Sequence, residues 1–164
     1  MCGPQTPRPS QPLGGALAVL NAPSPSPSSP SPGAALSGHM VFHTLPGPST
    51  SPPTMATHMT YTPSCASAPA ADDEHPLDGC VVGIHSTGDM RTTTTTTGYD
   101  DLLHRLDFRT SLCGRTRSSA GLVLDEPLEI GVGGGGIIGR KVSVWRDFGN
   151  GRGVRVAEGI VGFN

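Results

Sequence analysis

Glycines dominate residues 132–140, VGGGGIIGR, and their spacing is suited to binding a phosphate group. Gly134, Gly136 and Gly139 form the pattern G-x-G-x-x-G directly after a short apolar run. Glycine allows a tight turn and lets backbone amides approach a pyrophosphate closely. Glu158 lies 19 residues after Gly139, where an acidic side chain would accept hydrogen bonds from a ribose. The spacing therefore predicts a dinucleotide-binding turn in which these four residues contact the cofactor.

Residues 128–158 resemble the fingerprint of the FAD/NAD(P)-binding Rossmann oxidoreductases, whose motif often reads GGGIIG. The resemblance covers less than a fifth of the chain. It implies a strand before the glycines, a helix after them and a second strand that ends near Glu158. It also implies FAD or NAD as the cofactor, with Gly134, Gly136 and Gly139 at the phosphates and Glu158 at the ribose. On this interpretation the chain holds an incomplete α/β (βαβ) unit, a truncated dinucleotide-binding fragment of an oxidoreductase.

A second interpretation of the same residues is a β-hairpin. Val142 and Val144 suit the alternation of a strand as well as they suit a helical period, and β-branched residues are weak helix formers. Residues 149–153, GNGRG, are typical of a hairpin turn. We therefore predict a strand at 141–145 that pairs with a strand at 154–158, and we assign no catalytic residue.

The first 71 residues differ in composition from the rest of the chain. They hold 15 of the 17 prolines, and Arg8 is their only charged side chain. Ordering a residue costs about 1–2 kcal/mol in backbone entropy, and these Pro/Ser-rich segments offer few large apolar side chains to offset it. Proline also lacks the amide donor that a helix or a sheet ladder needs. We predict that residues 1–71 are intrinsically disordered and of low complexity, with a boundary at Asp72.

The remainder of the chain divides into two regions. Residues 72–120 are transitional, and we predict one short helix near 100–108 because Leu102, Leu103 and Leu106 fall on one helical face. Residues 121–164 hold three apolar runs separated by glycines, so we predict a small, glycine-rich and β-rich segment there.

Charge and cysteine content argue against several classes of site. A net charge of −2 provides no basic surface for nucleic acid, and no apolar run reaches the roughly 18 residues that cross a membrane. The four cysteines are widely spaced, so we predict no metal site and no disulfide framework. We expect a soluble intracellular protein in a reducing compartment. The sequence does not favour secretory or organellar targeting, because residues 1–71 lack the basic residues of a targeting peptide.

The proline-rich region indicates the partners. Its Ser-Pro and Thr-Pro pairs are substrates suited to proline-directed kinases, and its PxxP segments are suited to proline-recognising modules. We therefore predict a mostly disordered, non-enzymatic, interaction-type protein with a small C-terminal β-rich hairpin, one short helix and no cofactor. The alternative is the truncated FAD- or NAD-binding fragment.

Overall fold

The computed structural model describes residues 14–23, 35–45, 54–64, 77–90, 101–108, 112–116, 119–147 and 153–164. These residues form strands joined by turns and loops, and no helix among them is long and apolar enough to cross a membrane. The strands are β1 (Ala16–Leu20), β2 (Gly38–His43), β3 (Met55–Pro63), β4 (Cys80–His85), β5 (Leu102–Asp107), β6 (Leu112–Thr116), β7 (Ser119–Glu129), β8 (Lys141–Asp147) and β9 (Gly153–Phe163).

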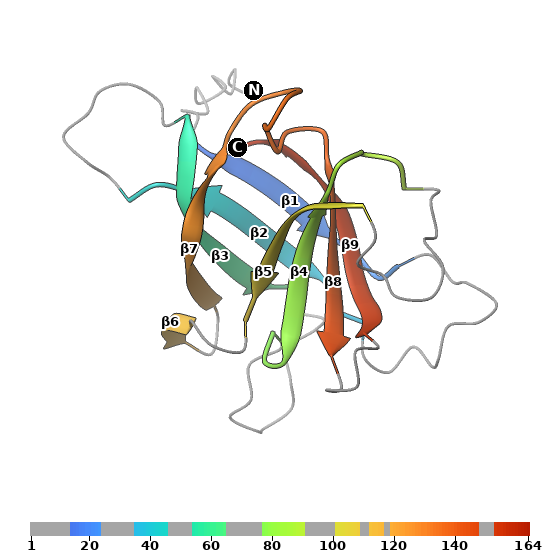
Figure 1. The fold of residues 1–164 in the computed structure, drawn as a ribbon. Helices are drawn as coiled ribbons and strands as arrows, with labels where there is room; N and C mark the ends of the chain where they lie inside the picture. The colour runs from blue at the N-terminus through green and yellow to red at the C-terminus, as the bar shows by residue number, and fades with distance from the viewer. Residues whose placement is uncertain are drawn as a thin grey trace, which may run out of the picture.

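All of these strands join one antiparallel sheet in the order β5-β4-β8-β9-β1-β2-β3-β7-β6. The sheet curls into a nearly closed barrel of eight strands, from β5 at one edge to β7 at the other, and β6 is attached to β7. Figure 1 shows β1, β2 and β3 as the rear wall and β4, β5 and β8 as the front wall, with β7 closing the left side. The opening of the barrel therefore lies between β5 and β7.

Side chains that alternate along the strands fill the barrel. Ala16, Ala18 and Leu20 of β1 are buried, and Phe42 and Tyr61 are among the largest fully buried side chains. An eight-stranded barrel has an interior just wide enough for side chains to fill. Each large apolar side chain that is buried in this way contributes about 1.5–3 kcal/mol to folding. The rear wall is therefore stabilised both by the backbone hydrogen bonds between its paired strands and by the packing of its buried side chains.

The prediction of a mostly disordered chain, with residues 1–71 intrinsically disordered and of low complexity, is wrong. β1, β2 and β3 lie within that region, and they pair with C-terminal strands through Ala18↔Val161 and Tyr61↔Ala120. Each of these strands is too short to form a core alone, but the C-terminal strands supply the rest of the core. The prediction rested on the proline content averaged over 71 residues. It therefore overlooked the short segments of β2 and β3, in which buried side chains recur at every second position over part of the strand. The Pro/Ser-rich residues 24–34 and 46–53 lie outside the described residues.

The predicted helix near 100–108 is also wrong, because residues 102–107 form strand β5. Its three leucines suit a helix and a strand about equally, and the pairing with β4 decides between them. In that pairing Ile84 lies opposite His104, and Val82 lies opposite Leu106. Long-range pairing has overridden a weak local preference.

The two interpretations of residues 128–158 have different outcomes. The predicted pairing of 141–145 with 154–158 is present as β8 and β9, with Ser143 opposite Glu158, but it is part of a large sheet rather than an isolated hairpin. The alternative βαβ unit is wrong, because β8 occupies the place of the helix and runs antiparallel to β9. Strands from both sides of Asp72 build the same sheet.

Candidate functional site

The glycine-rich residues 131–140 form a compact turn that leads from β7 to β8. Gly134 and Gly139 adopt the left-handed backbone conformation, with φ of 49° and 80°. Gly136 is required for a different reason, because a Cβ atom there would lie 2.2 Å from the carbonyl oxygen of Gly131. The spacing of these three glycines is thus explained by the path of the turn itself.

Arg140 closes this turn with its own side chain. Its guanidinium donates hydrogen bonds to the carbonyl oxygens of Gly134, Gly136 and Ser86. The carbonyl oxygens of Gly134 and Gly136 in the turn therefore point toward the positively charged guanidinium of Arg140. A phosphate site has the opposite polarity, because it requires backbone amides that point toward the anion.

The backbone amides of residues 136–139 are engaged within the fold. Each donates to a backbone carbonyl, and the acceptors are Gly133, Glu129, Gly131 and Val161 in that order. The structure thus brings Gly134, Gly136 and Gly139 together in one turn. The backbone amides of residues 136–139 donate their hydrogen bonds to carbonyl oxygens of the protein rather than pointing toward an open anion site.

Glu158, the predicted ribose contact, belongs to a buried layer of polar side chains on β8 and β9. One of its carboxylate oxygens lies 3.7 Å from the Lys141 ammonium and 3.3 Å from the Arg155 guanidinium. Burial, followed by the Arg155 charge, lowers the pKa of Lys141, while Glu158 acts in the opposite direction. The arrangement is that of a buried ion pair within the sheet.

A second polar contact in this layer joins β4 to β8. His85 Nε2 and Ser143 Oγ are hydrogen-bonded at 2.9 Å, and the His85 ring lies 5.7 Å from the Trp145 ring. A serine and a histidine at this distance could form a nucleophile and its base. Ser143 is fully buried, however, so a substrate has no access to its hydroxyl. Burial lowers the pKa of His85, which keeps the ring neutral.

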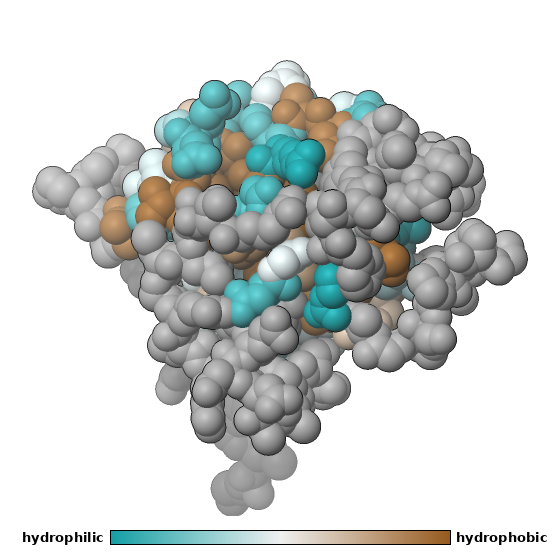
Figure 2. Space-filling model, turned by 60° about the horizontal axis from the view of Figure 1, so that its bottom comes forward, coloured by the Kyte–Doolittle hydropathy of each residue, from teal (hydrophilic) through white to brown (hydrophobic). Residues whose placement is uncertain are grey.

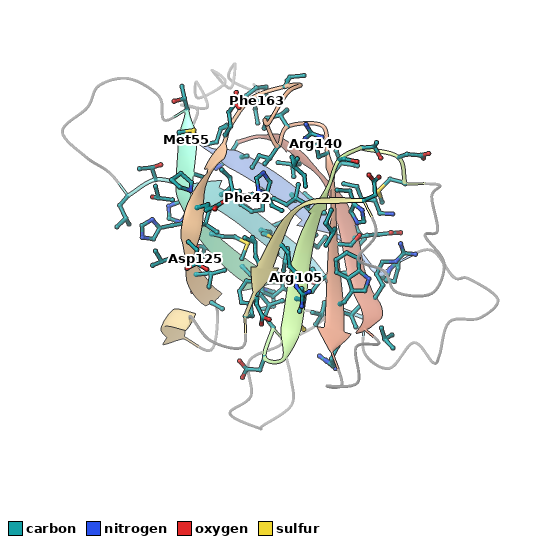
Figure 3. All side chains as sticks on the ribbon, in the orientation of Figure 1. Phe42, Met55, Arg105, Asp125, Arg140 and Phe163 are labelled. Atoms are coloured by element: carbon teal, nitrogen blue, oxygen red, sulfur yellow. The ribbon has the colours of Figure 1, made fainter. Side chains whose placement is uncertain are left out.

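An accessible cleft of about 430 Å³ lies at the opening of the barrel, among the residues that the structure describes. It is lined by residues 103–107 of β5 and by residues from 122 to 128 of β7. Figure 3 places Arg105 on β5 and Asp125 on β7 at the two sides of this opening, with Phe42 on the wall behind. Figure 2 shows hydrophobic and hydrophilic patches adjacent to one another on the face that it presents. The residues that line the cleft are likewise of both kinds.

Aliphatic side chains form the inner surface of the cleft. Leu122, Leu124 and Leu128 of β7 are buried and belong to the core, and Leu106 of β5 packs against that core. Arg105, Asp125 and Glu126 are exposed. The lining therefore combines an aliphatic inner surface with several charged side chains, as expected for a ligand that has both apolar and polar parts.

His104 is the polar group of the inner wall. It lies opposite Ile84, a core residue, so its side chain turns toward the barrel interior. The Nε2 atom of its ring is buried, and no described residue supplies a hydrogen-bond partner for it. Burial lowers the pKa of His104, which keeps the ring neutral near pH 7.

Sequence reasoning missed this cleft because it treated 100–108 as a helix, in which His104 and the leucines fall on opposite faces. The signal that identifies the strand is the period-two series His104, Leu106 and Phe108, in which Phe108 is fully buried. No local signal places this series beside β7, because the two strands do not pair with each other.

Comparisons with known proteins add no family to this description. No protein-family model matches the chain, and a search of curated proteins found no match. The resemblance of residues 128–158 to the Rossmann fingerprint, and FAD or NAD as a cofactor, therefore stay predictions. Among the described residues, no three His, Cys, Asp or Glu side chains gather as metal ligands would.

Proposed function

We propose that the protein is a non-enzymatic binding protein whose ligand is a small molecule, with an apolar part and a polar part, held between β5 and β7. The observation that carries this proposal is the cleft itself, since its 430 Å³ falls within the roughly 300–1,000 Å³ of ordinary ligand sites. Its buried leucines would cover the apolar part of the ligand, and the charged residues at its edge would remain in water.

The direction of the strands favours a small ligand over an inserted peptide strand. Every neighbouring pair from β5 round to β7 is antiparallel, so with eight strands β5 and β7 themselves run in opposite directions. A strand inserted between them would run parallel to one of its two neighbours. Parallel pairing is slightly less stable per residue than antiparallel pairing, and it would break the pattern of the sheet.

The free length of the β7 edge also favours a small ligand. β6 pairs with β7 only from Ser119 to Leu122, so within the described sheet the edge from Val123 to Leu128 has no strand beside it. This is about six residues of edge. The cleft is therefore short, and its side chains rather than its backbone dominate the surface that a ligand meets.

Fluorescence titration with N-phenyl-1-naphthylamine, a neutral apolar probe, tests the proposal. Leu103 lines the cleft and is 36% exposed, so Leu103→Asp should fold and should weaken probe binding about tenfold through loss of one apolar contact. Val19→Asp is the matched control, because Val19 is a half-exposed apolar residue of β1 and lies outside the cleft.

Two results would count against this function. One is the absence of saturable probe binding to the folded wild-type protein, with folding verified by circular dichroism. The other is saturable binding of FAD or NAD that Leu103→Asp leaves unchanged, which would favour the dinucleotide interpretation. Equal weakening by Leu103→Asp and Val19→Asp would place the probe outside the cleft.

A further inference from the structure

We propose that the outer face of the β2–β3 pair binds a divalent transition-metal ion, such as Ni²⁺ or Cu²⁺, between the imidazole rings of His43 and His58. The site goes beyond the proposed function and does not depend on it, because neither histidine lines the β5–β7 cleft. It is carried by the separation of the two rings and by the hydrogen bond that each ring makes to a threonine.

Strand pairing brings the two histidines together. His43 and His58 lie directly opposite each other in the antiparallel pairing of β2 with β3. Their neighbours Phe42 and Met59 are fully buried in the core, so the alternation of side chains places both histidines on the outer face of the sheet. Both are only partly buried. Their ring centres lie 5.8 Å apart, with the ring planes 23° from parallel.

One nitrogen of each ring is hydrogen-bonded to a threonine hydroxyl. His43 Nε2 lies 2.9 Å from Thr60 Oγ1, and His58 Nδ1 lies 2.8 Å from Thr57 Oγ1. A metal-binding histidine commonly donates its other ring N–H to a hydrogen-bond acceptor, which leaves a lone pair for the metal on the remaining nitrogen. The nitrogens that would bind the ion are therefore Nδ1 of His43 and Nε2 of His58.

Both of these nitrogens can be reached from solvent. The hydrogen bonds of the two rings use the opposite nitrogens. Within the part of the chain that the structure describes, neither Nδ1 of His43 nor Nε2 of His58 is a buried atom that lacks a hydrogen-bond partner. An ion could therefore approach both nitrogens without any opening of the barrel.

The separation of the rings is close to the value that a shared ion requires. An ion about 2.0–2.1 Å from one nitrogen of each ring, with an angle of about 90–110° at the metal, places the ring centres roughly 4.5–5.3 Å apart. The observed 5.8 Å exceeds this range by about half an ångström. Small rotations about χ2 can supply the difference, because that torsion is broad in histidine.

The donor set determines the kind of ion. No third His, Cys, Asp or Glu ligand joins the pair among the described residues, so water would complete the coordination. Imidazole nitrogens combined with water oxygens suit Ni²⁺ and Cu²⁺ in tetragonal geometry. The site is thus an open one, in which two protein ligands hold the ion and the remaining positions face solvent.

Calorimetric titration with NiCl₂ tests the inference, since Ni²⁺, unlike Cu²⁺, does not oxidise cysteine thiols. The folded wild-type protein should bind Ni²⁺ saturably. His43→Gln and His58→Gln should each weaken the strongest site by about tenfold or more, because each removes one of two ligands that act together. His39→Gln is the matched control and should leave the affinity unchanged, since His39 is an exposed histidine of the same strand β2.

The wild-type protein provides a second readout that needs no variant. In spectra of the imidazole nitrogens, substoichiometric Ni²⁺ should broaden the ring signals of His43 and His58 first. Affinity that both variants leave unchanged, equal weakening by His39→Gln, broadening centred on other histidines, or no saturable binding to the folded protein would each overturn the inference. The probe titrations that test the cleft are separate measurements, so failure here would leave the proposed function intact.

Discussion

The rear wall of the barrel and the opening between β5 and β7 use the same alternation of apolar side chains, yet they differ in one respect. On the rear wall β1 pairs with β2 over five residues and β2 pairs with β3 over six, so backbone groups and side chains are satisfied together. At the opening, leucines from β5 and β7 face a common space, but the two strands form no ladder. Strand pairing, rather than residue type, separates the structural side of this barrel from its accessible side.

This difference indicates how the molecule divides its tasks. Burial of Phe42, Met40 and Tyr61 on the rear wall stabilises the fold. The leucines of the opening contribute less to the fold because one side of their surroundings is a cleft. The exposed apolar side chains at the opening, Leu103 and Val123, are available to contact a ligand.

The largest expected effect compares one core residue from each region. Phe42→Ala should lower the free energy of unfolding by about 3–5 kcal/mol, since the ring is fully buried in the continuous wall. Leu124→Ala should cost about 2 kcal/mol, at the low end of its class, because the cavity would merge with the cleft. Urea unfolding measures both values. Equal losses would mean that the opening is packed as tightly as the wall.

The second prediction concerns the turn beside the opening. Gly136→Ala should cost about 3 kcal/mol, because its Cβ would lie 2.2 Å from a backbone oxygen and the turn would have to shift. Gly134→Ala should cost about 1–2 kcal/mol, since the only penalty is the left-handed conformation and no atom lies within 4 Å. Thermal unfolding of the two variants gives the comparison. A larger loss for Gly134→Ala would contradict the role assigned to Gly136.

Part of the local structure between residues 128 and 158 could be predicted from the sequence, but the strands β1, β2, β3 and β5 and the long-range structure could not. The importance of the glycines at 134, 136 and 139 and the pairing of β8 with β9 follow from spacing and turn composition. The pairing of Ala18 with Val161 joins residues far apart in the chain, and no local pattern specifies it. The cleft shows the consequence for function, since its lining depends on where β5 lies relative to β7.

A smaller effect is expected in the pH dependence of stability. The pKa of His104 and that of His85 are lowered from 6.5 by burial, so the unfolded chain binds more protons than the folded protein below about pH 6.5. Stability should therefore fall as the pH decreases through that range. His104→Leu should show a shallower decrease, with the part due to His85 remaining. Urea midpoints between about pH 8 and pH 5 measure the slope. Identical slopes would place His104 outside the buried wall.

The most direct test of the account is a map of the amide signals that move when N-phenyl-1-naphthylamine is titrated into the folded protein. The account predicts saturable changes at residues 103–107 of β5 and residues 122–128 of β7, with β1 and β2 unaffected. Changes centred on β1 and β2, or no saturable change anywhere, would contradict the claim that the opening between β5 and β7 is the binding site.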